Sequence, residues 1–229
     1  MTNTISCLDH GFVSLVDHMG SDLSIVRSAR VSVDAAWRAG EDEGKDARLI
    51  HRLWRDKHTS PFESVVFTFE VMAPIFVFRQ WHRHRTQSYN ELSARYKELP
   101  ETYYLPNVVD VGMQSKDNKQ GRSTVMMDAE RIAGRKDEID LVNKHCIAAF
   151  DLYHSLLLVD WPRELARMVL PVNTYSHMFA TMNLLNLFRF LTLRCDSHAQ
   201  YEIRVYANAM LELIKPICPV AVEAWSLYA

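Results

Sequence analysis

The chain has 229 residues, 48% of them hydrophobic and 10% aromatic, which is enough to bury a substantial core and predicts one domain over residues 1–229. Its 26 basic and 28 acidic side chains give a formal charge of -2, so no global positive field favours a nucleic-acid backbone. A membrane-spanning helix needs about 18 uninterrupted apolar residues, and no segment has that many. The cysteines show no C-x-x-C spacing. Nucleic-acid-binding, membrane-spanning and disulfide-stabilised classes are therefore disfavoured, and we expect a cytoplasmic protein.

Glycine is scarce and arginine dominates the basic residues. The sequence holds 7 glycines, and neither G-x-G-x-x-G nor a P-loop is present. A bound nucleotide would therefore have its phosphates held by side chains instead of a glycine-rich backbone loop. Of the 26 basic residues 18 are arginines, whose planar guanidinium suits bidentate binding of phosphate or carboxylate.

Hydrophobic periodicity in the first third of the chain predicts two helices, a strand and a third helix. Residues 21–31 and 46–57 carry apolar side chains three to four apart, as on one face of a helix. Residues 65–71 alternate between large apolar and smaller or polar side chains, which is typical of a strand. A helix from Ile75 to about His84 would follow Pro74, which suits a first turn.

Two segments without helical periodicity come next. Residues 86–96 are expected to be extended, with alternate side chains on one side of the strand. These alternate side chains are those of Gln87, Tyr89, Glu91, Ser93 and Arg95. Residues 110–124 are polar and nearly free of large apolar groups, so they predict a mobile excursion or lid.

The second half of the chain is mainly helical in pattern. An apolar stripe over 139–157 predicts a long helix that ends before Pro162, and a short helix is expected over 162–170. A strand near 175–182 precedes an apolar helix over 184–194. Residues 197–200 have the form of a capping box and are expected to start the final long helix. Short strands mixed with long helices indicate an α+β fold.

A dense polar segment, residues 79–95, spans the end of the predicted third helix and the extended run that follows. Aromatic and aliphatic residues are interleaved with its arginines, so several guanidiniums are expected to be partly buried, and buried guanidiniums need anionic partners. Glu91 alone cannot satisfy Arg79, Arg83, Arg85 and Arg95. The segment therefore predicts a phosphorylated ligand.

Arg83-His84-Arg85, seven residues and Ser93 match the R-H-R-x7-S signature, and the chain here resembles the flavin-dependent thymidylate synthases. Residues 58–63, 162–167 and 193–200 resemble further segments of that family, so the likeness covers most of the chain outside 110–138. The resemblance implies a mixed α/β protomer with a central sheet flanked by long helices. It also implies a homotetramer with active sites shared between chains. The implied reaction is methylation of dUMP to dTMP through bound FAD, with NADPH as reductant and methylenetetrahydrofolate as carbon donor.

The resemblance also assigns residues to ligands. The implied dUMP contacts are Gln80, Trp81, His82, Arg83, Glu91, Leu92, Ser93, Ala94, Arg95, Arg167 and Arg194. The implied FAD contacts are Ser60, Arg83, His84, Arg85, Glu91, Asn183 and Arg189. Members of the family usually carry arginine at the position of Leu185, and Arg189 lies four residues on along the same helical face. We therefore expect Arg189 to replace that charge.

Three residues are candidates for catalysis. Hydride addition to C6 of uracil creates an enolate-like anion, and Arg194, which stays protonated, is expected to stabilise it. Ser93 has no apparent histidine–carboxylate relay, so it is assigned to hydrogen bonding of the nucleotide instead of nucleophilic attack. His58 is implicated by the resemblance, although by itself it would be read as a structural or capping residue. The spacing of His82, His84 and Cys195 supports no metal site.

Two alternative functions stay open at this level. A related flavin enzyme could modify another pyrimidine nucleotide with the same fold, for instance by hydroxymethylation. A non-catalytic RNA- or DNA-binding module could use the same arginines and aromatics for phosphate contacts and base stacking. The net charge of -2 disfavours the binding module.

Overall fold

The computed structural model describes residues 3–116, 118–123 and 129–228. A five-stranded antiparallel sheet lies at its centre, with strand order β1-β2-β3-β7-β4. The strands are β1 Thr4–Cys7, β2 Gly11–Met19, β3 Val66–Pro74, β4 Ser88–Glu91 and β7 Tyr175–Asn183. The longest ladder joins β3 to β7 from Val66–Asn183 to Pro74–Tyr175, so it pairs the two halves of the chain.

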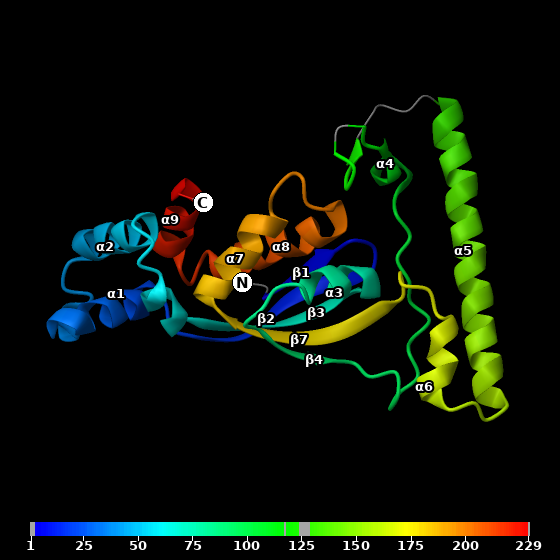
Figure 1. The fold of residues 1–229 in the computed structure, drawn as a ribbon, viewed down its shortest axis with the longest axis horizontal. Helices are drawn as coiled ribbons and strands as arrows, with labels where there is room; N and C mark the ends of the chain where they lie inside the picture. Colours follow the sequence, from blue (N-terminus) through cyan, green and yellow to red (C-terminus); the bar gives the residue numbers. More distant parts are fainter. Residues whose placement is uncertain (1–2, 117, 124–128, 229) are drawn as a thin grey trace.

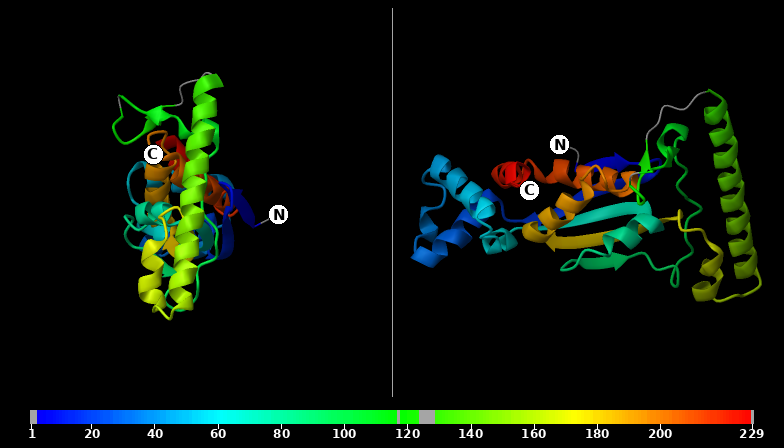
Figure 2. Two further views of the ribbon diagram at one scale, coloured as in Figure 1. Left: turned by 90° about the vertical axis from the view of Figure 1, so that its right-hand side faces the viewer. Right: turned by 45° about the horizontal axis from the view of Figure 1, so that its top comes forward.

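Helices cover one face of the sheet and both of its ends (Figure 1, Figure 2). Helices α3, α7 and α8 lie on the face, α1, α2 and α9 gather at one end, and α5 and α6 stand at the other. The bounds are α1 Asp22–Arg30, α2 Glu43–Arg55, α3 Ile75–Trp81, α4 Val108–Val111, α5 Ala129–Leu158, α6 Arg163–Ala166, α7 Leu184–Arg194, α8 Tyr201–Ile214 and α9 Pro219–Tyr228. The minor elements are η1 Val31–Val33, η2 Ala36–Arg38, η3 Ser60–Ser64, η4 Arg167–Val169 and the hairpin strands β5 Met113–Gln114 and β6 Arg122–Ser123.

The alternation in β3 decides which face of the sheet is covered. Phe67, Phe69 and Val71 are fully buried, whereas Thr68 and Glu70 on the opposite face are half-buried. A period of two residues places the first set against the helices and the second set on the open face. The main core therefore lies between the sheet and the layer of α3, α7 and α8.

Helix α5 contributes a second, smaller core. Its buried residues all lie in its C-terminal half, where Phe150 and Tyr153 pack with Ala166 of α6. The rest of the helix extends beside the sheet (Figure 2), and Leu141 and Leu152 are 64% and 48% exposed. One chain therefore leaves apolar surface of α5 uncovered.

The predicted α+β class with a central sheet is confirmed, and so are several individual elements. The helices expected over 21–31 and 46–57 are α1 and α2, and the strands near 65–71 and 175–182 are β3 and β7. The helix over 184–194 has the bounds that its apolar run indicates.

Other boundaries were wrong. The helix expected to reach His84 ends at Trp81, and the run over 86–96 forms strand only at Ser88–Glu91 before turning at 94–96. The turn arises because the backbone N–H groups of Tyr96 and Lys97 both donate to the carbonyl of Ser93. Alternation therefore stops before Ser93, and Arg95 is not on the strand.

The C-terminal third also differs from expectation. Helix α8 begins at Tyr201, and its N-cap Gln200 makes no side-chain cap, so 197–200 is not a capping box. A shorter helix, α9, which was not predicted, follows α8. Helix α5 begins at Ala129, well before its expected apolar stripe. Residues 110–124 include part of α4 and the β5–β6 hairpin, although 117 and 124 lie outside the described residues. Closure of this segment as a lid stays a prediction.

Replacing Gly11 with alanine should destabilise the fold. The added Cβ would collide with the hydroxyl of Tyr206 and lie 2.6 Å from the carbonyl oxygen of Met72. Tyr206 is fully buried and donates to that same carbonyl at 3.0 Å, so it has no room to retreat. We expect the free energy of unfolding to fall by about 1 to 3 kcal/mol, the usual cost of overpacking, in a urea titration.

Gly134 provides the matched control. It lies inside α5, and a Cβ there would meet nothing within 4 Å. Gly134→Ala should raise the free energy of unfolding by about 0.5 to 1 kcal/mol, because alanine is the better helix former. Equal effects of the two variants would contradict the steric account of Gly11.

Candidate active site

Arg194 ends α7, beside the C-terminal end of α3. Its Nε donates to Nε2 of His84 at 2.8 Å, Nη1 to the side-chain oxygen of Gln80 at 3.4 Å, and Nη2 to the backbone carbonyl of Gln80 at 3.3 Å. More than 100 residues of chain separate the two sides of this contact. The fold thus brings Gln80 and Arg194, both predicted to contact dUMP, together with His84, which was predicted to contact FAD.

This group is electrostatically unusual because its partners are neutral. Burial lowers the pKa of Arg194, and the nearby charge of Arg83 lowers it further. Within the described residues, Arg83, Arg85 and Arg194 form no ion pair with a carboxylate. Guanidiniums remain protonated even so. The cluster therefore holds net positive charge that favours an anionic ligand.

His84 acts as the neutral acceptor of this group. Burial and the charge of Arg194 lower its pKa from 6.5 to about 4. Its ring also packs edge-on against Phe190, with centroids 4.7 Å apart. Because Nε2 accepts from Arg194, the ring proton must lie on Nδ1. His84 therefore holds Arg194 without competing for its charge.

The turn after α3 is built on buried aromatic residues. Trp81 is fully buried, and its Nε1 donates to Oε1 of Gln87 at 3.3 Å. The Tyr89 hydroxyl donates to the same oxygen at 2.9 Å and lies 3.1 Å from the carbonyl of His84. These contacts fix the course of 82–88. Trp81 has no exposed surface, so it supports this turn from the core, and its contact with dUMP stays a prediction.

A second group begins at the end of β4. Glu91 accepts from the Ser176 hydroxyl at 2.7 Å, and its other oxygen lies 4.0 Å from Nε2 of His82. The backbone N–H of Leu92 donates to the carbonyl of His177 at 2.7 Å. His82 follows α3, so this contact places the start of the second group next to the Arg194 group.

The turn at Ser93 carries the rest of the second group. Ser93 Oγ accepts from the backbone N–H of Arg95 at 3.3 Å, and Ala94 is 5% exposed. Nε of Arg95 lies 3.5 Å from a carboxylate oxygen of Glu164 in α6, and exposed Arg167 begins η4 directly after that helix. No histidine in the described residues bonds to Ser93. The geometry therefore supplies no general base for Ser93 as a nucleophile.

The third group lies at the opposite end of β7. His58 and Ser60 are exposed in the connection between α2 and β3. Asn183 caps α7, because its Oδ1 accepts from the backbone N–H of Asn186 at 2.9 Å. Arg189 is exposed and donates to the side chain of Asn186 at 3.2 Å.

These groups do not form one pocket within a single chain. Asn183 ends β7, whereas Leu92 pairs with His177 near its start. Six residues along a strand correspond to roughly 20 Å. The structure therefore joins the Arg194 group to the Glu91 group and places the turn after Glu91 far from Asn183, whereas Thr86, Gln87 and Ser88 line one cavity together with Asn183.

Comparisons with known proteins agree with this arrangement. The sequence model of the family described as "Thymidylate synthase complementing protein" matches residues 14–220. The flavin-dependent thymidylate synthase of Treponema denticola is 47% identical over 221 residues, which are 96% of this chain and 81% of the relative. That of Thermotoga neapolitana is 46% identical over 225 residues, covering 98% and 95%.

The chain belongs to the flavin-dependent thymidylate synthase family. A crystal structure of the UMP/dUMP methylase PolB from Streptomyces cacaoi, bound with 5-Br dUMP, is 37% identical with a TM-score of 0.86. It covers 98% of both chains. The resemblance seen in the motif of Arg83 to Ser93 is therefore confirmed, and the family favours an enzyme over a nucleic-acid-binding module.

One residue of the Arg194 group, Gln200, was not predicted as a site residue from the sequence of this thymidylate synthase family member. Gln80 donates through Nε2 to Oε1 of Gln200, the residue before α8. The available signal was the resemblance of 193–200 to a family segment.

Two further findings concern the described residues alone: they contain no group of three or more His, Cys, Asp or Glu placed to hold a metal, and no helix long and apolar enough to cross a membrane.

Titration of His84 should reveal its neutral state. Its folded pKa of about 4 lies below its ordinary 6.5, so the unfolded chain binds the proton first as the pH falls. The stabilising contribution of His84 is thus complete above pH 6.5 and is lost as the pH falls from 6.5 towards about 4. NMR of the imidazole carbon-bound protons measures this pKa, with His84→Gln assigning the resonance. A midpoint above 6 would contradict the buried contact with Arg194.

Proposed function

We propose that the chain methylates dUMP to dTMP, with FAD as the flavin, NADPH as reductant and methylenetetrahydrofolate as carbon donor. The proposal rests on the Arg194 group, in which neutral acceptors hold a half-buried guanidinium. It rests also on the membership of the chain in this family. The relatives, which are flavin-dependent thymidylate synthases, and the dUMP analogue bound to PolB support the same substrate. The reaction takes place in the cytoplasm.

Arg194 stabilises the pyrimidine as its charge develops. Hydride addition at C6 of the uracil ring would place negative charge on C5 and on the C4 carbonyl oxygen, as in an enolate. A guanidinium has five N–H groups. Three of those in Arg194 donate to His84 and Gln80, so two remain for the ring. The attraction between this preorganised cation and the ring grows as the negative charge forms, and this lowers the activation barrier.

The second group binds the nucleotide beyond its ring. Arg95, beside Glu164 of α6, and Arg167, directly after that helix, are exposed cations suited to a phosphate, and the Ser93 hydroxyl donates to the same ligand. The backbone around Trp81 and the side chain of His82 complete the wall with Glu91. Leu92 and Ala94 contribute through the backbone of the turn. His58 lies outside this group, and its role in the reaction is carried by the resemblance alone.

The residues of the third group, together with the R-H-R segment, would hold the flavin. When bound, the flavin supplies the hydride chemistry. Exposed Arg83 and Arg85, which have no carboxylate partner in the described residues, fit a diphosphate, and His84 lies between them. Ser60, Glu91, Asn183 and Arg189 add polar contacts. Leu185 is 4% exposed, so the charge on this helix comes from Arg189 instead.

Active sites shared within a homotetramer account for the separation of the groups. Ser60 and Asn183 lie at the far end of β7 from the turn at Ser93, so a complete site needs another copy to bridge them. The exposed apolar residues of α5, such as Leu141 and Leu152, provide surface for such an assembly.

UMP is a second candidate substrate. The solved relatives of 37% and 35% identity are described as a UMP/dUMP methylase, one bound with 5-Br dUMP and the other with 5-Br UMP. The two nucleotides differ by the ribose 2′-hydroxyl. Because the ring contacts of Arg194 do not involve the ribose, the proposed chemistry applies to either nucleotide.

Product analysis tests the proposed function. Purified flavin-loaded protein, incubated with NADPH, methylenetetrahydrofolate and dUMP, should yield dTMP by mass spectrometry. Arg194→Ala should lose about 3 kcal/mol of barrier stabilisation, roughly a hundredfold or more in rate, while retaining the flavin spectrum. A parallel reaction with UMP measures the substrate preference. A hydroxymethylated product would support the alternative flavin enzyme, and absence of any pyrimidine product would contradict both.

Mixing two inactive variants tests shared sites. Arg95 is held at Glu164 of α6, whereas Arg194 is held between α3 and α7. If different chains supply these arginines to one site, a mixture of Arg95→Ala and Arg194→Ala should regain activity, because some hybrid sites carry neither defect. Subunit exchange is verified by native mass spectrometry. Exchange without recovery would assign both arginines to the same chain.

A further inference from the structure

Glu202 is a buried carboxylate outside the residues assigned to either ligand. It is 2% exposed and lies in the first turn of α8. One oxygen accepts from the Tyr104 hydroxyl at 3.2 Å and from Nη1 of Arg122 at 3.0 Å, and the other accepts from Nε2 of Gln200 at 2.8 Å. A buried ion pair is weak evidence for stability, because desolvation offsets the attraction. The carboxylate can still fix the orientation of the side-chain amides around it.

The direction is set by the chemistry of the carboxylate. An ionised carboxylate only accepts hydrogen bonds, so Gln200 must turn its amide nitrogen towards Glu202. Its amide oxygen then faces Gln80, which must in turn present its own nitrogen. The oxygen of Gln80 is left facing Nη1 of Arg194, 3.4 Å away. Each amide has a single orientation that satisfies its two neighbours.

We propose that Glu202 is a positioning residue for the pyrimidine site, which acts through Gln200 to orient the Gln80 amide towards Arg194. The inference rests on the proposed function, in which Gln80 and Arg194 contact dUMP. If the Gln80 amide were reversed, it would place N–H donors against the N–H groups of Arg194. The guanidinium would then lose one of its three holding contacts and its alignment with the ring.

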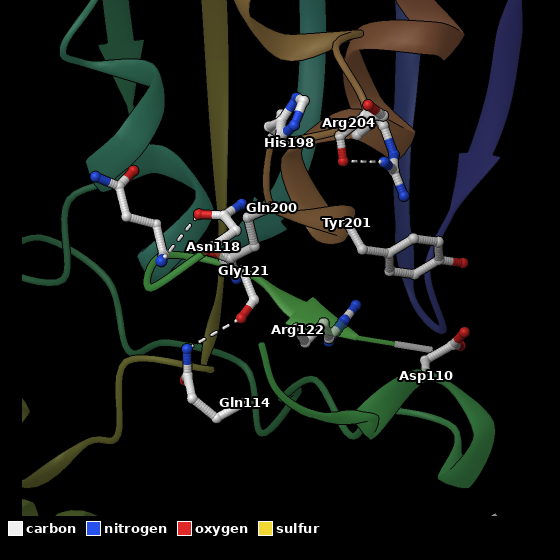
Figure 3. Close-up of a pocket in the computed structure, with 12 residues that line it drawn as sticks. Asp110, Gln114, Asn118, Gly121, Arg122, His198, Gln200, Tyr201 and Arg204 are labelled. Carbon is white, nitrogen blue, oxygen red and sulfur yellow. Dashed lines mark hydrogen bonds between the residues drawn. The ribbon is translucent and has the colours of Figure 1, made fainter. Parts of the chain in front are cut away.

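The surroundings of Glu202 support a fixed carboxylate. Arg122 and Gln200 line the same cavity of about 280 Å³ at the start of α8 (Figure 3). The guanidinium of Arg122 also lies 5.1 Å from the centre of the Tyr201 ring. Burial raises the pKa of Tyr104, with Glu202 adding to the shift, so the hydroxyl stays a donor. The first oxygen is therefore occupied by two donors, and Gln200 has the second.

Glu202→Gln tests the relay because it keeps the size of the side chain, and its amide oxygen, held by the donors Tyr104 and Arg122, leaves an N–H facing Gln200. In the flavin-loaded full-length protein, isothermal titration with dUMP should show a dissociation constant raised at least tenfold. Flavin affinity should change by less than twofold. Tyr104→Phe is the matched control, since it removes one donor to Glu202 and leaves the contact with Gln200; dUMP affinity should stay within twofold.

Exchanging the two side chains provides the decisive rescue. In Gln200→Glu/Glu202→Gln, the carboxylate at position 200 accepts from both position 202 and Gln80, so the Gln80 amide keeps its orientation at unchanged net charge. This double variant should bind dUMP within threefold of the parent. A merely structural role for Glu202 predicts no such recovery.

Each result has one meaning. Unchanged affinity in Glu202→Gln, equal weakening in Tyr104→Phe, or failure of the double variant to recover would overturn the relay while the parent still binds dUMP. A parent that does not bind dUMP would overturn the proposed function and the relay together. If Glu202→Gln does not fold, Gln200→Ala removes the relay at an exposed position and should weaken dUMP binding to the same extent; normal affinity there overturns the inference.

Discussion

The half-buried guanidinium of Arg194, held by neutral acceptors, is the interaction on which the site depends. A carboxylate partner would neutralise the charge that an anionic pyrimidine needs. His84 and Gln80 instead fix the position of the guanidinium and leave its charge available. The lowered pKa of His84 has the same origin, because burial and Arg194 both disfavour a second positive charge. One contact thus sets both the geometry and the electrostatics of the group.

The fold supplies this contact through its longest ladder. The β3–β7 pairing aligns the two halves of the chain, and each strand runs directly into a helix, β3 into α3 and β7 into α7. These helices share the covered face of the sheet (Figure 1), so the end of α7 reaches the end of α3. The ring of buried Phe190 in α7 packs against His84 and so fixes this acceptor against the core. The pairing of β3 with β7 therefore positions the side chains of the Arg194 group.

Periodicity predicted the elements that bury one face, such as β3, β7 and α7, because burial imposes a pattern on the sequence. It did not predict the turns that place the site. The strand over 86–96 stops at Glu91 because the Ser93 carbonyl captures two backbone donors, a local hydrogen-bonding choice without apolar pattern. The candidate ligand residues were predicted from the resemblance at the motif of Arg83, whereas the contact of Gln80 with Gln200 spans 120 residues and leaves no periodic pattern in the sequence. Long-range polar pairing is where sequence reasoning failed.

Helix α7 shows how burial limits the choice of cofactor residues. Leu185 is 4% exposed within an almost wholly buried first turn and a half, while Arg189, four residues later, faces solvent. A cation at position 185 of this chain would have to be desolvated unless a ligand or another copy paired with it, which costs several kcal/mol. At position 189 the charge stays hydrated, and the Asn186 side chain aligns it at 3.2 Å. Because i and i+4 lie on one face, the proposed replacement of a cation at 185 by Arg189 would keep the charge on the same face of α7 while the core keeps its leucine.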